Sequence, residues 1–194
     1  MRRFAAIAAL LIFPTIAAAQ GHQSEAGPEL FGVLAVGWLN EDEGSLGSAL
    51  DIGGGGGYRW RSPLAAEVQL GRLSAERRFE SGVEFDATLL QLSGRLLYHF
   101  PGRNAEPYVG GVLGLTRYER TSRFPVLVLG PDGRPVRQGD EVIRSDGSEF
   151  TWGGVVGLRV RARRVQVRPE VTVLITRPSS FVVVSAGVKI GWRP

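Results

Sequence analysis

The two histidines are the first residues to consider, because histidine is the most common general base of enzyme sites. His99 ends an alternating apolar segment and precedes the turn-forming Pro101-Gly102, whereas His22 lies in a polar stretch near the N-terminus. A serine–histidine pair needs a nucleophile held within hydrogen-bond reach, and no spacing in the chain places a serine beside His99. We therefore predict no catalytic residue and no enzyme activity, with His99 at the rim of the fold.

A run of five glycines, Gly53 to Gly57, has the composition of a phosphate-binding loop. Such a loop continues with Lys-Ser or Lys-Thr and opens a helix, but here Tyr58-Arg59-Trp60 continue an alternating strand pattern. Glycines that allow close packing and curvature within a strand are the better interpretation. We expect no bound phosphate, cofactor or metal.

Charged side chains of both signs share one face of several alternating segments, which suits either an ion-pair network or a lined pore. The set comprises Asp51, Glu67, Glu170, Arg95, Arg159, Arg168 and Lys189. If these segments are strands that close into a barrel of eight, their side chains fill its interior. The sequence therefore favours a packed ion-pair core over a channel.

The elements that position these charges are strands, and the clearest ones end the chain. Alternation with a period of two runs over 150–161, 165–176 and 182–192, and this period is the signature of a half-buried strand. Soluble strands usually have five or six residues. A strand of this length, rising about 3.3 Å per residue at a tilt near 40°, spans roughly 25–30 Å, which matches the apolar band of an outer-membrane barrel.

Five earlier strands complete a predicted set of eight, over 30–40, 46–60, 64–73, 83–100 and 108–120. Short turns fall around Arg61, Gly102 and Arg163, and the longest irregular stretch covers 121–147. The orientation of the first strand stays open because both of its faces are apolar. That of the fifth stays open because Leu113 shares a face with Arg117.

Composition limits the remaining classes of protein. The chain has 194 residues, no cysteine and a formal net charge of +4. Met1-Arg2-Arg3, an apolar core and Ala17-Ala18-Ala19 predict a signal peptide over 1–19, followed by a loose segment over 20–29 and a barrel over 30–194. Without Arg2 and Arg3 the charge is +2, from 4 − 2, so nucleic acid is not an expected partner.

Together the signal peptide, the eight strands, the Pro107–Gly111 opening and the final strand with Trp192 resemble the small outer-membrane β-barrel family. This family includes the OmpA transmembrane domain and the OmpX and OmpW types. The resemblance implies an all-β fold, an eight-stranded antiparallel transmembrane β-barrel in the outer membrane, monomeric and without cofactor. It implies lipopolysaccharide, outer-membrane lipid and the assembly machinery as partners. Family members commonly end in an aromatic residue, whereas Arg193-Pro194 end this chain.

Alternation alone does not say which face meets lipid, since a soluble barrel shows the inverse pattern. Glycines crowd the polar face, as a narrow interior requires. Aromatic residues sit near strand ends on the apolar face, as membrane girdles do: Tyr58, Trp60, Tyr98, Phe100, Phe150, Trp152 and Trp192. Both observations favour the membrane barrel. Pro169 lacks a ladder N–H, and we expect a bulge or a rim position there.

The predicted function is a non-enzymatic scaffold or a surface-interaction, adhesin-like role carried by extracellular loops. The alternative is a narrow porin-like channel for small or apolar solutes, which the OmpW resemblance allows. A periplasmic N-terminus would make 121–147 an outward connection, and we expect that loop to hold an extracellular ligand, with Val126 to Leu129 as a hairpin arm. At the outer rim, lipopolysaccharide phosphates are within reach of Arg77, Arg78, Arg117 and Arg120.

Overall fold

The computed structural model describes residues 26–41, 44–79, 81–102, 105–129, 132, 134–162, 165–177 and 181–192. The predicted signal peptide and the Arg193-Pro194 end lie outside these residues. The first strand begins at Gly27, so the last three residues of the segment expected to be loose belong to the barrel instead.

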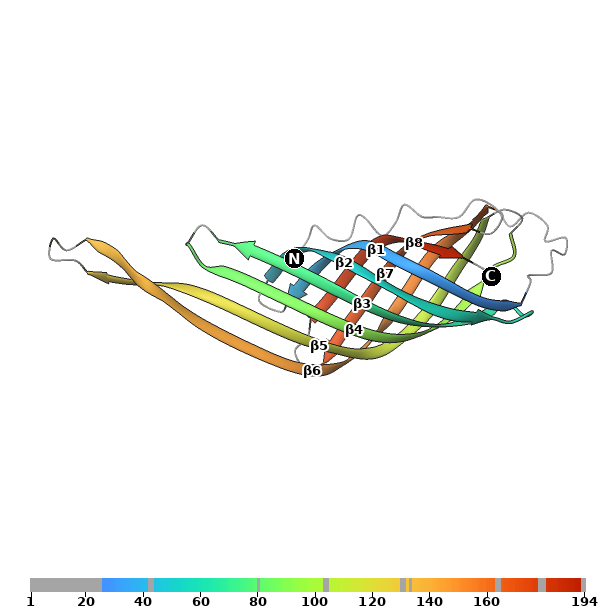
Figure 1. Cartoon of the computed structure of the whole chain (residues 1–194), viewed down its shortest axis with the longest axis horizontal. Helices are drawn as coiled ribbons and strands as arrows, with labels where there is room; N and C mark the ends of the chain where they lie inside the picture. The colour runs from blue at the N-terminus through green and yellow to red at the C-terminus, as the bar shows by residue number, and fades with distance from the viewer. Residues whose placement is uncertain are drawn as a thin grey trace.

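Eight antiparallel strands close into a barrel in sequence order, with β1 also paired to β8 (Figure 1). Their bounds are β1 Gly27–Glu41, β2 Gly44–Arg59, β3 Leu64–Arg78, β4 Glu84–His99, β5 Ala105–Leu129, β6 Pro135–Ala162, β7 Val165–Arg177 and β8 Phe181–Trp192. The predicted eight-stranded antiparallel barrel is confirmed. Among the described residues, no helix is long and apolar enough to cross a membrane. We call the barrel end with Gly27 and Trp192 the proximal end and the opposite end the distal end.

Alternating burial along each strand separates the two faces as the sequence pattern predicts. The outward face is aliphatic around the barrel, with Leu34 59% exposed and Ile190 61% exposed. The predicted girdle residues all point outward. Near the proximal end four of them form two edge-to-face pairs, Tyr58 with Trp60 at 5.8 Å and Tyr98 with Phe100 at 5.2 Å between ring centroids.

The structure explains why the sequence did not fix the orientation of β1 and β5. In β1, Leu34 points outward while Phe31 and Val33 are buried in the interior, so both faces are apolar for different reasons. In β5, Leu113 and Leu115 point outward, and the exposed Arg117 continues the same face farther along the β4–β5 ladder. The outward face of β5 becomes polar at Arg117 because the strand extends past the apolar belt of the barrel.

The interior has two halves of opposite character. The proximal half is charged, while the distal half is an apolar plug of buried side chains, namely Leu39, Leu73, Phe85, Leu89, Leu174 and Val183. Glycines make room for the large proximal side chains. A Cβ at Gly55 would collide with the Val68 carbonyl oxygen and the Phe31 ring. The glycine run is strand, as predicted.

The prediction of an irregular stretch over 121–147 is wrong. β5 continues to Leu129 and β6 begins at Pro135, and the two pair along their whole length, with one register shift between Val126 and Leu127. The hairpin arm predicted at Val126 to Leu129 is confirmed but is much longer (Figure 1). Pairing with a neighbour satisfies the backbone groups, so charged and glycine-containing segments extend as strand.

Pro169 does not produce the expected bulge. The β6–β7 pairs Gly157↔Glu170 and Val160↔Val167 belong to one register, and the ladder lacks the two pairs between them. On its other side Pro169 pairs with Val188 of β8. The missing N–H therefore interrupts one ladder locally without shifting it.

Candidate functional site

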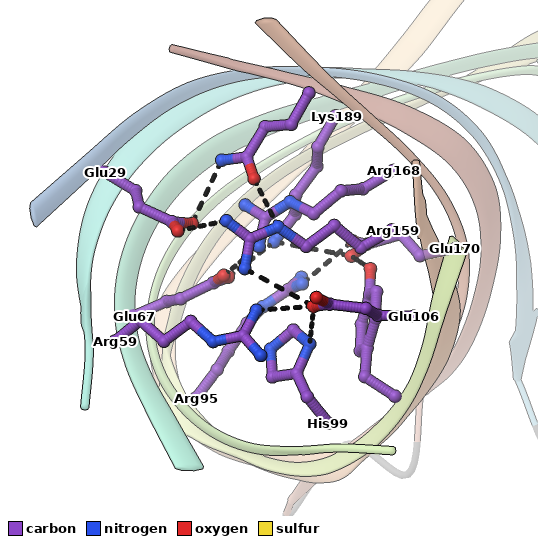
Figure 2. Close-up of polar contacts among 12 residues, drawn as sticks. Glu29, Arg59, Glu67, Arg95, His99, Glu106, Arg159, Arg168, Glu170 and Lys189 are labelled. Carbon is purple, nitrogen blue, oxygen red and sulfur yellow. Dashed lines mark hydrogen bonds and ion pairs between the residues drawn. The ribbon is translucent and has the colours of Figure 1, made fainter. Parts of the chain in front are cut away.

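A buried ion-pair cluster fills the middle of the barrel. The Glu67 carboxylate of β3 accepts hydrogen bonds from Arg168 of β7 and, at 3.0 Å, from Lys189 Nζ of β8. These three side chains are at most 3% exposed. Since the strands lie on different sides of the barrel, the contacts cross its interior (Figure 2).

A second carboxylate completes this cluster. Glu170 of β7 accepts hydrogen bonds from Arg95 Nη1 of β4 at 2.8 Å and from the Tyr108 hydroxyl of β5 at 2.8 Å. Lys189 Nζ lies 3.4 Å from it and so joins both carboxylates. The Phe31 ring packs beneath the cations, 4.4 Å from Lys189 Nζ. Every carboxylate and cation in the cluster has at least one opposite charge.

A second layer lies toward the proximal end. Glu29 of β1 accepts from Arg159 and from Gln166 Nε2 at 3.0 Å. Glu106 of β5 accepts from Arg59 Nη1 at 2.6 Å, and Arg161 Nη2 lies 3.0 Å from it. Figure 2 shows Glu29, Arg59, Glu106 and Arg159 pointing into the barrel interior toward one another.

The two charged layers and the apolar plug leave little free volume in the lumen. A cavity of about 20 Å³ lies between charge and plug, beside Asp51, Gln91 and Thr116. That volume holds about one water molecule. Within the described part of the chain, paired charges and apolar side chains thus occupy the interior of the barrel.

Six of the seven charges predicted to face inward belong to these two layers, and Asp51 lines the cavity instead. The predicted set of inward charges did not include Glu29, Arg59 and Glu106, which also belong to the proximal layer. Arg59 continues the alternating face of Asp51 and was recognisable from that spacing, whereas Glu29 lay in a segment expected to be loose.

His99 ends β4 at the proximal end, in the predicted rim position, but its side chain points inward and is only 2% exposed. The ring centroid lies 5.2 Å from that of Tyr108, and Nδ1 lies 3.9 Å from Glu106 Oε2. The histidine is thus packed within the proximal charged layer. The alternation of Ser93, Arg95 and His99 places the imidazole on the inward face, as the burial pattern of β4 confirms, but alternation could not predict its contacts with Tyr108 and Glu106.

The second candidate region is the arm, defined as 124–129 of β5 with 135–149 of β6. The β4–β5 ladder stops at Glu84↔Arg123 and the β6–β7 ladder stops at Phe150↔Arg177. Beyond these pairs, β5 and β6 bond only to each other among the described strands. The arm therefore leaves the barrel with two open strand edges, and Figure 1 shows it extending far beyond the other hairpins.

Apolar side chains are exposed along the arm, with Val136, Val142 and Ile143 each about half exposed. A hollow of about 280 Å³ lies on the arm's inward-turned face where it leaves the barrel, lined by Arg120, Ser122, Phe124, Ile143 and Ser145. It offers an arginine, two hydroxyls and two apolar groups. Such a mixture suits recognition of a partner rather than solvation alone.

Charged contacts brace the base of the arm. Glu84 forms ion pairs with Arg78 and, at 3.6 Å, with Arg123. Arg120 lies over the Phe85 ring at 4.7 Å, and Arg77 over Phe79 at 4.6 Å. The four arginines predicted at the outer rim do lie at the distal end, and each of them contacts a neighbouring side chain.

Comparison with known families gives one decisive match. The model of the outer membrane protein beta-barrel domain matches residues 5–165. The chain belongs to this family. Among solved structures it is similar to Neisserial surface protein A, with a TM-score of 0.66 and 14% identity over 88% of this chain and 100% of that one. A search of curated proteins found no match.

The attachment invasion locus protein, Ail, of Yersinia pestis is similar as well, with a TM-score of 0.60 and 10% identity over 87% of this chain and 99% of that one. At these identities the likeness concerns the fold. As an outer-membrane barrel, the protein lies in the outer membrane with its aliphatic outward face against lipid. The aromatic girdle at the proximal end then meets one membrane interface.

Proposed function

We propose that the protein is a non-enzymatic surface-interaction protein, in which a closed barrel holds the arm away from the membrane to contact an extracellular partner. The observation that carries this proposal is the arm itself. It leaves the barrel with exposed apolar residues, a hollow and two open strand edges. A structural scaffold alone has no use for such a projection, because unpaired edges invite association.

The proposed orientation places the arm outside the cell. Both described chain ends lie at the proximal end, since β1 starts there and β8 ends there. A chain that enters from the periplasm begins and ends on the periplasmic side when its strand number is even. The distal arm then faces the exterior, where its base arginines are placed to meet lipopolysaccharide phosphates.

The filled lumen argues against the alternative of a narrow channel. Two layers of paired charges and an apolar plug would all have to rearrange before a solute could pass. Breaking buried ion pairs is costly. Planar-bilayer recordings should therefore show no defined conductance step. A reproducible single-channel conductance would instead favour the channel function.

The names of the similar structures agree with a surface role. Ail of Yersinia pestis is an attachment and invasion locus protein, and its structure was also determined with the heparin analogue sucrose octasulfate. Neisserial surface protein A is named for the cell surface. Sulfated glycans are accordingly among the ligands that an arm with arginines could bind.

The test removes the arm while leaving the barrel intact. Arg123 and Val142 face each other in the β5–β6 ladder, so residues 124–141 can be replaced by Asn-Gly, which forms a two-residue hairpin turn and keeps every β4–β5 ladder pair. Cells with the intact or the armless protein are offered immobilised sulfated glycans, extracellular-matrix proteins and a layer of cells that express the intact protein. We expect the armless variant to lose adhesion at least tenfold.

A matched control shows that the barrel survives. The armless variant should keep the heat-modifiable migration of a folded barrel and the same surface abundance as the intact protein. Equal adhesion by both forms to every surface in the panel would refute the proposed function. Loss of the folded form would instead call for the shorter replacement of 126–139 by Asn-Gly, which joins Pro125 to its ladder partner Asp140.

A further inference from the structure

We propose that the open edge of β6 pairs in antiparallel fashion with the same edge of a second copy of this chain, across two facing membranes. The inference rests on the proposed function and names the partner of the arm. The edge runs from Pro135 to Glu149, where β6 has no neighbour opposite β5 among the described strands. An unpaired edge of this length exposes backbone N–H and C=O groups that another strand can satisfy.

Two identical strands that pair symmetrically must obey one geometric rule. The twofold axis stands normal to the sheet, and one residue therefore lies opposite its own copy. When the whole free edge overlaps with itself, that residue is Val142, which lies midway between Pro135 and Glu149. Val142 is 48% exposed, so the centre of the contact is apolar.

The charge pattern selects this register. With Val142 at the centre, Asp140 of each copy lies opposite Arg144 of the other, and no like charges face each other. Moving the centre one residue back places Glu141 opposite Glu141. Moving it one residue forward places Asp140 opposite Asp146 twice. Opposite charges in facing positions stabilise a sheet and like charges destabilise it.

The direction of pairing decides where the partner lies. Two copies in one membrane have arms that point the same way, so their β6 edges could meet only in parallel. Equivalent residues would then lie at similar heights, with Arg144 beside Arg144 and Asp140 beside Asp140. Copies in facing membranes have opposed arms and meet in antiparallel fashion. The barrels remain separate within each membrane, and the contact joins one membrane to another.

Single cysteines test the geometry cleanly because the chain has none of its own. Val142→Cys is introduced into protein held in lipid nanodiscs, one barrel per disc. Residues opposite each other in an antiparallel pair have Cα atoms about 4.5–5.5 Å apart, which a disulfide spans. Mild oxidation should therefore give covalent two-disc particles.

The matched control is Ser148→Cys, an exposed position on the same strand and the same face, with no register shift between it and Val142. It should not form a disulfide with its own copy, because the proposed register places the two copies of Ser148 far apart. Equal cross-linking of Ser148→Cys and Val142→Cys with themselves would indicate parallel or random contact and would overturn the proposal. So would the absence of any cross-link at Val142.

Charge reversal gives a second readout in the protein without cysteine. Arg144→Asp creates two like-charge contacts and should weaken association of two discs, measured by sedimentation, roughly tenfold. Adding Asp140→Arg should restore it. Unchanged association in Arg144→Asp would reject the register. If the discs never pair while the arm still binds a glycan or matrix protein, this inference fails and the proposed function stands; an armless variant that adheres like the intact protein refutes both.

Discussion

The barrel and the arm are built from the same two strands, β5 and β6, yet they differ in what surrounds them. Inside the barrel each strand has a neighbour on both sides, and Glu106 of β5 and Arg159 of β6 are buried against partners from β2 and β1. In the arm β5 and β6 pair only with each other among the described strands, and charged side chains such as Asp140, Glu141 and Arg144 are exposed. One hairpin thus serves stability at its base and leaves contacts unmade at its tip.

Charge therefore has opposite roles in the two regions. A charge in the barrel is fixed by its partner, because an unpaired buried charge is costly. A charge in the arm contributes little to stability, since water and salt screen it. The arm can therefore vary its charges for recognition, whereas the barrel cannot.

The largest predicted effect is on the buried cluster. Glu67→Gln removes the carboxylate that Arg168 and Lys189 share and leaves two buried cations without it. We expect a loss of about 3–5 kcal/mol in the free energy of unfolding, measured by urea titration in lipid vesicles. A loss below about 1 kcal/mol would mean that the barrel tolerates unpaired interior charge as the arm does.

Packing gives the next largest effect. Gly55→Ala forces a Cβ against the Val68 carbonyl oxygen and the Phe31 ring, which supports the Lys189 ammonium. Overpacking of this kind should cost about 1–3 kcal/mol. Gly111→Ala is the matched control, since a Cβ there meets nothing within 4 Å. Equal effects of the two substitutions in the same titration would show that the interior is not closely packed.

The smallest effect is expected at the base of the arm. Glu84→Gln removes ion pairs with Arg78 and Arg123, both at least half exposed. The free energy of unfolding should fall by less than about 1 kcal/mol, and the change should vanish in high salt. A loss as large as that of Glu67→Gln would erase the contrast between the two regions.

The number of strands, the inward or outward direction of their side chains and the aromatic girdle could be predicted from the sequence. The reason is that backbone geometry fixes the period of two along a strand. Alternation could not predict that Glu67 pairs with Arg168 and Lys189, since those contacts cross the barrel and depend on strand tilt. Nor could it predict the length of the arm. Residues such as Asp140 and Gly147 favour turns when alone, but continuous pairing with β5 holds them in strand.

The proposed topology is tested most directly by finding the side of the membrane on which the arm lies. Val142→Cys in the arm and Ser62→Cys in the β2–β3 turn are exposed thiols at opposite ends of the molecule. Intact cells are treated with a maleimide that does not cross the outer membrane. If the arm lies outside the cell, only position 142 should be labelled on intact cells. Position 62 should be labelled only after the membrane is opened. Labelling of 62 but not 142 on intact cells would contradict the proposed topology.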